Sequence, residues 1–225
     1  MATQVQPFAF RLGITKDWKS RWFHKNEYKN FLREDFLIRG FLTEKLRKSG
    51  LDKVEIERSA NQLKVIIFTS KPGLIIGRGG TGAETLKKEI EEKYRRISKT
   101  KKGINIKLQI EEITKPEINA QLVAQQIADQ IEKRMQFRRT MKQAIEKVMQ
   151  NKEAQGVKVR MAGRLDGSEM SRTEWLLQGK IPLQTLRADV DFATVNAYCT
   201  YGVVGIKVWI YKGEVFEKVQ NEKKP

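Results

Sequence analysis

Residues 74–84 read Leu-Ile-Ile-Gly-Arg-Gly-Gly-Thr-Gly-Ala-Glu, and this stretch decides the fold of the first half of the chain. Three apolar residues lead into a glycine-rich turn. Thr81 and Glu84 then have the spacing of a capping box, which predicts a helix that starts at Thr81. Pro72 and Gly73 end the apolar run that precedes the stretch. The pattern therefore predicts a tight glycine loop between two short helices.

Gly77, Gly79 and Gly82 also satisfy the spacing G-x-G-x-x-G of dinucleotide-binding sites. Such a site needs a strand that enters the turn directly and an acidic residue about 20 positions later. Here a proline and a glycine separate strand from loop, and the later position falls among lysines and arginines. A Gly-x-x-Gly loop over residues 77–80 is the better interpretation, because its glycines let an RNA backbone approach closely. Arg78 adds a positive charge, and a purely structural turn is the alternative.

The segments around this loop are predicted to alternate between helices and strands. Apolar residues between Phe31 and Leu46 fit a helix, and the helix that follows the loop continues through Ile90. Strands are predicted over residues 54–58, 63–69 and 104–110. Residues 38–111 thus have the order helix, strand, strand, helix, loop, helix, strand.

The second half of the chain is predicted to form a separate domain over residues 112–213. Apolar residues recur at helical spacing from Ala120 to Met135, and a second helix carries Met141, Ile145, Val148 and Met149 on one side. Strands are predicted at 157–161, 174–177, 188–197 and 205–211. We expect an α/β (α+β) chain whose second domain packs two helices on a mainly antiparallel sheet. Residues 214–225 are predicted to be a flexible tail.

The composition indicates a polyanionic partner. The 225 residues include 44 Lys and Arg against 27 Asp and Glu, a net charge of +17, and nucleic acid is the commonest partner for such an excess. No segment has the roughly 18 apolar residues of a membrane-spanning helix, so we expect a soluble protein without a membrane partner. A single cysteine cannot form a disulfide framework, so we expect the protein to be cytoplasmic. Cys199 and His24 are the only residues of their types. We therefore predict no cofactor, no metal site and no enzymatic activity.

Residues 1–37 are predicted to be a basic and aromatic extension that includes the start of the first helix. Its predicted RNA contacts are Arg11, Lys16, Lys19 and Arg21. Aromatic side chains lie between them, which suits an arm on RNA because bases stack on aromatic rings while cations meet phosphates. The equally weighted alternative is that Trp18 and Trp22 cover the core of the following domain.

Two further basic runs contain no acidic residue. The first gives the predicted RNA contacts Arg95, Arg96, Lys99, Lys101 and Lys102; the second holds Lys133, Arg134, Arg138, Arg139 and Lys142. The last three crowd the first turn of a predicted helix, where the helix dipole disfavours each cation by some tenths of a kcal/mol, roughly. Few carboxylates lie at helical spacing to balance them. The run indicates an anionic partner, and a solvated helix face is the alternative.

The order of elements over residues 38–111 resembles the prokaryotic type (type II) of KH domain. Gly77 and Gly80 match the loop glycines of that family, with Arg78 and Gly79 as its variable pair. The resemblance implies a helix pair against a three-stranded mixed sheet. It also implies that about four nucleotides of single-stranded RNA bind beside the loop.

Nearly the whole chain is similar to the S-three family of bacterial small-subunit ribosomal proteins. The similar segments are Arg11–Ile14, Met135–Lys142, Gly163–Leu165, Arg172–Trp175, Thr185–Asp191 and Thr200–Ile210. The resemblance implies a protein of the subunit head that binds ribosomal RNA and lines the channel through which messenger RNA enters. Arg138, Arg139 and Lys142 would face the messenger and aid its unwinding, and Arg134 and Arg164 would be further RNA contacts.

The same resemblance implies partners besides RNA. They are the head proteins S-ten and S-fourteen and the channel proteins S-four and S-five. Two other functions are compatible with the sequence: a free KH-domain regulator that binds RNA outside the ribosome, and a nucleic-acid lyase that uses a lysine. Asp189 and Asp191 share one face of a predicted strand without an evident partner, so no catalytic residue is predicted there.

Overall fold

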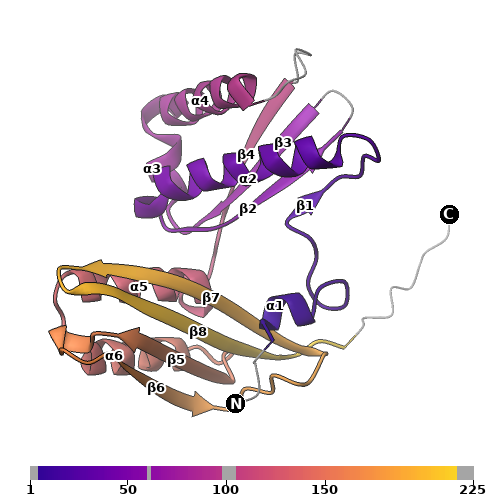
Figure 1. Ribbon diagram of the computed structural model, residues 1–225. Coiled ribbons are helices and arrows are strands. Elements are labelled where there is room, and N and C mark those ends of the chain that lie inside the picture. Colours follow the sequence, from indigo (N-terminus) through magenta and orange to yellow (C-terminus); the bar gives the residue numbers. More distant parts are fainter. Residues whose placement is uncertain (1–4, 60–61, 98–104, 217–225) are drawn as a thin grey trace. The chain divides into compact units, whose positions relative to one another are not determined.

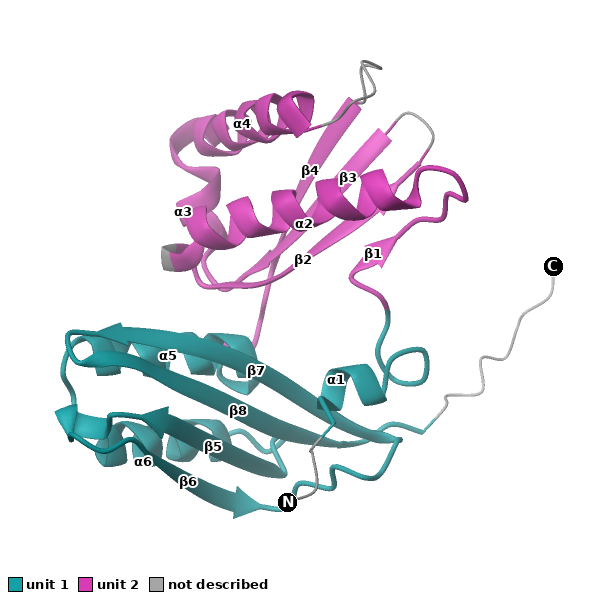
Figure 2. Cartoon of the chain, in the orientation of Figure 1, with its two compact units in different colours: residues 1–17, 117–225 teal, residues 18–116 magenta. Residues whose placement is uncertain are grey.

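The computed structural model describes residues 5–59, 62–97 and 105–216, and the chain forms two compact units (Figure 2). The central unit comprises residues 18–116, and the terminal unit combines residues 1–17 with residues 117–225. The stretch 1–37, predicted to be one extension, is thus divided between the two units. Charge and aromatic content alone could not indicate this division, because it depends on which distant segments the side chains contact.

The central unit contains a four-stranded mixed sheet with the strand order β1-β2-β3-β4. β2 and β3 are antiparallel, whereas β1 with β2 and β3 with β4 are parallel (Figure 1). Its elements are β1 (Ser20–Arg21), α2 (Tyr28–Lys45), the 3-10 turn η1 (Arg47–Ser49), β2 (Leu51–Arg58), β3 (Gln62–Thr69), α3 (Pro72–Ile76), η2 (Arg78–Gly80), α4 (Thr81–Ile97) and β4 (Asn105–Glu112).

The two long helices of the central unit share one hydrophobic core with the sheet. Ile38 and Leu42 of α2 and Ile90 of α4 are buried against strand residues that include Ile56 and Ile67. This confirms the predicted helix pair on a mixed sheet, but the sheet has four strands instead of the expected three. α2 begins three residues before the predicted Phe31, and β1 is a strand that the sequence did not reveal, because two residues carry no readable alternation.

A buried polar cluster attaches the segment before α2 to the central unit. Asp35 accepts hydrogen bonds from Ser20 Oγ at 2.8 Å and from Trp22 Nε1 at 2.7 Å. It also pairs with Arg58, which reaches Glu34 at 2.6 Å. Trp22 therefore packs on this unit, as the structural alternative predicted, while the Trp18 side chain is 61% exposed.

The terminal unit packs two helices on one face of an antiparallel sheet with the strand order β6-β5-β8-β7 (Figure 1). Its elements are α1 (Pro7–Phe10), α5 (Ala120–Glu132), α6 (Phe137–Met149), β5 (Gly156–Gly163), the 3-10 turn η4 (Leu165–Gly167), β6 (Arg172–Gly179), β7 (Ala188–Cys199) and β8 (Gly202–Glu214). The 3-10 turn η3 (Pro116–Ile118) precedes α5. The predicted arrangement is confirmed, and β6 extends the predicted strand 174–177 at both ends.

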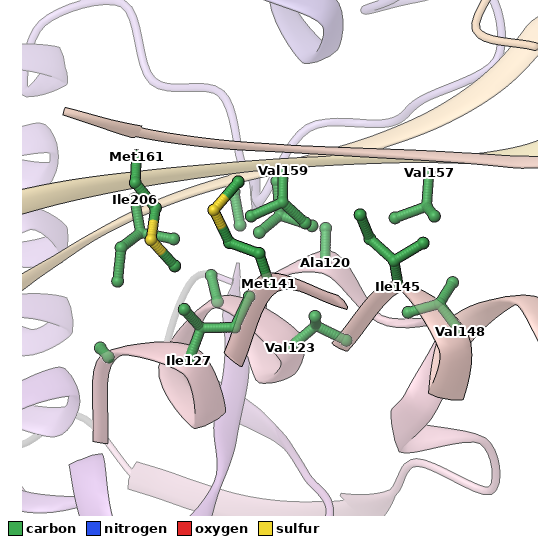
Figure 3. Packing of buried hydrophobic residues seen from close by; sticks show 14 of the residues in the cluster. Ala120, Val123, Ile127, Met141, Ile145, Val148, Val157, Val159, Met161 and Ile206 are labelled. Carbon is green, nitrogen blue, oxygen red and sulfur yellow. The ribbon is translucent and has the colours of Figure 1, made fainter. Parts of the chain in front are cut away.

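The core of the terminal unit lies between these helices and the sheet. Figure 3 shows Met141 and Ile145 of α6 pointing toward Val157, Val159 and Met161 of β5. Alternate strand residues fill this core, so the residues between them must lie on the opposite face of the sheet.

The link between α5 and α6 is longer than the sequence predicted, because α5 ends at Glu132 rather than near Met135. Arg134 adopts a left-handed conformation with φ of 62°. Its amide donates to Ile131 O at 2.9 Å, and the Met135 amide donates to Gln130 O at 3.1 Å. This is a Schellman motif with arginine at the position where glycine is usual.

Among the described residues no helix is both long and apolar enough to cross a bilayer.

Candidate nucleic-acid interface

The glycine loop joins α3 to α4 in the central unit. Gly77 ends α3 with φ of 69°, and Gly79 and Gly80 follow with φ of 61° and 82°. Residues other than glycine rarely adopt these angles because of the steric clash of their Cβ. The helix before the loop and the helix after it are both present as predicted.

Glycine is required in this segment for two different physical reasons, lack of space at one position and backbone angle at two others. A Cβ on Gly82 would lie 2.5 Å from Ile75 O, so α3 and α4 cross too closely for a side chain. A Cβ on Gly79 or Gly80 would meet no atom within 4 Å. At these two positions the backbone angle requires glycine, and the space beside the backbone is open to a ligand.

The surroundings of the loop are exposed. The Arg78 side chain is exposed, and Leu74 and Ile76 of α3 are 66% and 40% exposed. Thr81 begins α4 as predicted, but its backbone is already helical, and its hydroxyl donates to Arg78 O at 3.0 Å. It therefore closes the loop from within the helix instead of capping the helix from outside.

The basic start of α6 divides into a buried and an exposed side. Phe137, Thr140 and Met141 are buried, whereas Arg138, Arg139 and Lys142 are exposed. The first turn of α6 contains no acidic residue. Arg138 and Arg139 thus lie beside backbone amides whose partial positive charge repels them, and Lys142 follows in the next turn.

Arg138 differs from its two neighbours because a distant carboxylate balances it. Its Nε and Nη2 atoms both lie 3.3 Å from carboxylate oxygens of Glu174 on β6. Hydrogen bonding to Glu174, and then the charge of Glu174, raise the pKa of Arg138. Glu174 also pairs with Arg172 at 3.1 Å. Within the described residues Arg139 and Lys142 have no such ion pair.

Cations from distant parts of the sequence gather around Phe137. The guanidinium groups of Arg138 and Arg172 lie 5.6 and 5.5 Å from its ring centre. Arg134 and Arg164, both predicted RNA contacts, line a pocket of about 340 Å³ that also includes Phe137. Arg172 was not predicted as a contact, because its position near Phe137 depends on the pairing of β6 with β5. No local sequence pattern indicates that pairing.

Comparison with known proteins decides the family of the chain. Residues 127–210 match the family model "Ribosomal protein S3, C-terminal domain", and residues 37–118 match the KH domain. The small ribosomal subunit protein uS3 of Caldicellulosiruptor saccharolyticus is 50% identical over 96% of this chain and 94% of its own length. The uS3 proteins of Desulfitobacterium hafniense and Desulfovibrio desulfuricans are 48% and 45% identical, covering 96% and 97% of this chain and 94% and 98% of their own lengths.

The chain belongs to the uS3 family of small-subunit ribosomal proteins.

Membership of the uS3 family confirms the predicted ribosomal and RNA-binding character. The family is structural and non-enzymatic, and its members are components of the small ribosomal subunit. Among the described residues no group of three or more His, Cys, Asp or Glu side chains is placed to hold a metal ion.

One predicted RNA contact of this uS3-family chain is wrong. Arg11 has 0% exposure, and burial lowers its pKa while the charge of Asp189 acts in the opposite direction. Its guanidinium donates to five carbonyls at 2.6 to 3.1 Å, those of Ala188, Pro7, Pro182, Leu183 and Thr185. All of its donating nitrogens are engaged inside the protein, so Arg11 fixes the N-terminal segment to the terminal unit and cannot reach a phosphate.

The other N-terminal cations lie in two different places. Lys16 is partly buried and pairs with Asp189 at 2.6 Å in the terminal unit. Arg21 is exposed on β1 and pairs with Glu57 at 3.4 Å and Glu55 at 3.7 Å. Lys19 is exposed next to β1. Lys19 and Arg21 are thus exposed in the central unit, whereas Lys16 is partly buried in the terminal unit.

The basic end of α4 is only partly described. Arg95 and Arg96 are exposed in its last turn, and Arg96 lies 3.9 Å from Glu92. Lys99, Lys101 and Lys102 lie outside the described residues.

The start of the predicted tail over residues 214–225 is ordered in the terminal unit. β8 continues to Glu214, and the Val215 amide donates to Arg187 O at 2.8 Å.

Proposed function

We propose that this chain holds two kinds of RNA in the head of the small subunit. The glycine loop and Arg78 grip the backbone of ribosomal RNA. Arg138, Arg139 and Lys142 line the channel through which messenger RNA enters and contribute to the unwinding of structured messages.

The observation that supports the messenger role is the division of the start of α6 into a buried apolar side and an exposed basic side. Its three cations are exposed on a helix whose other side is buried, and the helix dipole disfavours Arg138 and Arg139 in the first turn. Phosphate groups would remove this repulsion. Arginine and lysine contacts to phosphate read no sequence, so such a surface could hold a sliding strand of any composition.

The Glu174 carboxylate competes with RNA phosphate for Arg138. RNA phosphate would displace it from Arg138, and both groups are exposed enough for such an exchange, at 71% for Arg138 and 28% for Glu174. Because an exposed ion pair contributes only about 0 to 1 kcal/mol, the exchange costs little.

The remaining parts of the proposal follow from the family. The chain would work in cytoplasmic ribosomes beside S-ten and S-fourteen in the head and near S-four and S-five at the channel. The open space beside the Gly79 and Gly80 backbone supports a contact with ribosomal RNA at the loop, since amides and an adjacent helix start favour phosphate.

The test is translation by ribosomes that carry Arg138→Ala, Arg139→Ala and Lys142→Ala together. Passage through a messenger with a stable hairpin should slow severalfold, while an unstructured messenger is translated at the normal rate. Sedimentation should show normal amounts of assembled small subunits. The matched control replaces Lys147, Lys152 and Lys180 by alanine, which removes the same charge from exposed positions elsewhere in the terminal unit.

Two results would count against the proposal. Failure of the α6 variant to assemble would mean that these cations bind ribosomal RNA rather than the messenger. Equal slowing on both messengers, or in the control variant, would mean that the effect is not one of unwinding.

A further inference from the structure

The open face of the terminal-unit sheet, which points away from α5 and α6, carries a second group of cations. Val157, Val159 and Met161 of β5 are buried under the helices, so Lys158 and Arg160 lie on the opposite face. In the register of the sheet, Arg160 lies directly opposite Lys207 of β8. Lys207 is far from Lys158 and Arg160 in sequence, and only strand pairing brings it beside them.

No carboxylate balances this group. In the register rows from Lys158 to Ala162, the open-face partners on the neighbouring strands are Thr173, Trp175, Leu177, Phe192, Thr194, Asn196, Gly205, Lys207 and Trp209. Across these rows, all within the described strands, no Asp or Glu faces outward, and Lys158, Arg160 and Lys207 make no ion pair. Like charges directly opposite on paired strands are destabilising.

An exposed aromatic ring lies beside the cations. Trp175 is the partner of Arg160 on β6, and 57% of it is exposed. The Lys158 ammonium lies 5.0 Å from the Trp175 ring centre and 5.6 Å from that of Trp209. A ring next to several cations suits single-stranded RNA, whose bases stack on aromatic rings while its phosphates meet the charges.

Among the described residues of the terminal unit, a small hydrophobic core covers one end of this face. Val190, Trp209 and Tyr211 form a small core with the partly buried Ile181 and Leu183. At the other end, which also holds Arg160, the side chains of Lys207 and Trp175 are exposed. A protein partner that buried this surface would need to supply acidic groups, whereas RNA supplies them in its backbone.

We propose that this open face is a separate binding site for single-stranded RNA. The phosphates contact Lys158, Arg160 and Lys207, and one base stacks on Trp175. The site lies on the opposite face of the sheet from α6, so it is distinct from the cations assigned to the messenger channel.

The test measures binding of the full chain to a fluorescein-labelled oligouridine of twelve nucleotides by anisotropy. The variant Lys158→Gln, Arg160→Gln, Lys207→Gln should bind at least tenfold more weakly, and its salt dependence should be shallower by about 2, at roughly 0.7 per phosphate contact. The control Lys147→Gln, Lys152→Gln, Lys180→Gln loses the same charge and should bind within twofold of the parent chain. Thermal unfolding should show no loss of stability in the sheet variant, because the substitutions remove a repulsion.

Changes at Trp175 test the stacking contact. Trp175→Ala should weaken binding at least about fivefold, in line with stacking energies of roughly 1–3 kcal/mol per base. Trp175→Phe should restore most of the affinity. If the sheet variant folds but binds oligouridine like the control, the inference is wrong.

Each binding series is repeated in the background Arg138→Ala, Arg139→Ala, Lys142→Ala, which separates the two proposals. A further loss on changing the sheet in that background supports an independent site. If the sheet changes have no effect in either background, only this inference fails, since the role of α6 is measured by its own variant. Normal RNA binding combined with failure to enter the small subunit would show that the face docks a protein, which would also overturn the inference.

Discussion

Arg11 and Arg138 both lie in basic segments of the sequence, yet the fold uses them in opposite ways. Arg11 is wholly buried and donates to five carbonyls, whereas the Arg138 side chain is 71% exposed and meets one carboxylate. Arg58 of the central unit belongs with Arg11, since it is almost fully buried against Asp35 and Glu34. A cation in the sequence can therefore either bind an anionic partner or form buried hydrogen bonds and ion pairs within the fold. The burial and the contacts of each residue distinguish the two cases.

The largest effect should come from removing the partner of a buried arginine. Asp35→Ala leaves Arg58 buried without its main counter-charge and should lower the free energy of unfolding by about 3–5 kcal/mol. Glu57→Ala, which removes an exposed partner of Arg21, should cost at most about 1 kcal/mol. Denaturant unfolding followed by circular dichroism measures both. Similar values for the two variants would contradict the division between internal and surface cations.

Arg11→Ala should have the next largest effect. It leaves several carbonyls without a charged donor, and we expect a loss of about 3 kcal/mol in the free energy of unfolding. RNA affinity, measured under conditions where the variant is folded, should stay within twofold of the parent chain. A variant that is stable but binds RNA weakly would restore Arg11 as an RNA contact.

Arg134→Gly sharpens the comparison because it separates stability from binding at a single residue. Glycine fits the left-handed position that Arg134 occupies, so thermal unfolding should show a gain of about 1 kcal/mol. Affinity for single-stranded RNA should fall, since a cation is lost from the pocket beside Phe137. If both quantities stay unchanged, the arginine has neither of these roles.

Glu174→Gln should have the smallest effect. Without the carboxylate, Arg138 is free to meet phosphate, and RNA affinity should rise about two- to fivefold, the range expected for an exposed ion pair. The matched control is Glu214→Gln, which releases Arg187 at the far end of β8. An equal rise in the control would mean that only net charge has changed.

The parts of the molecule that the sequence predicted depend on local patterns. The glycine loop is defined by residues that adjoin one another, and the helical period places Arg139 and Lys142 opposite Met141 on α6. Features that depend on distant pairing were missed. The burial of Arg11 requires carbonyls near Ala188, the balance of Arg138 requires β6 beside α6, and the cations of the open face meet only when β5 pairs with β8.

Arg134 was missed for another reason. A non-glycine residue in a left-handed turn contradicts the local preference from which helix ends are predicted. The apolar period therefore carried the predicted helix past its true end at Glu132.

The most direct test of the messenger-binding surface is the salt dependence of RNA affinity. The full chain and its Arg138→Ala, Arg139→Ala, Lys142→Ala variant are compared over a salt series with two single-stranded RNAs of unrelated sequence. Three lost phosphate contacts should make the plot of log affinity against log salt shallower by about 2 for the variant, at roughly 0.7 per contact, and equally so for both RNAs. Identical slopes for the parent chain and the variant would contradict the account.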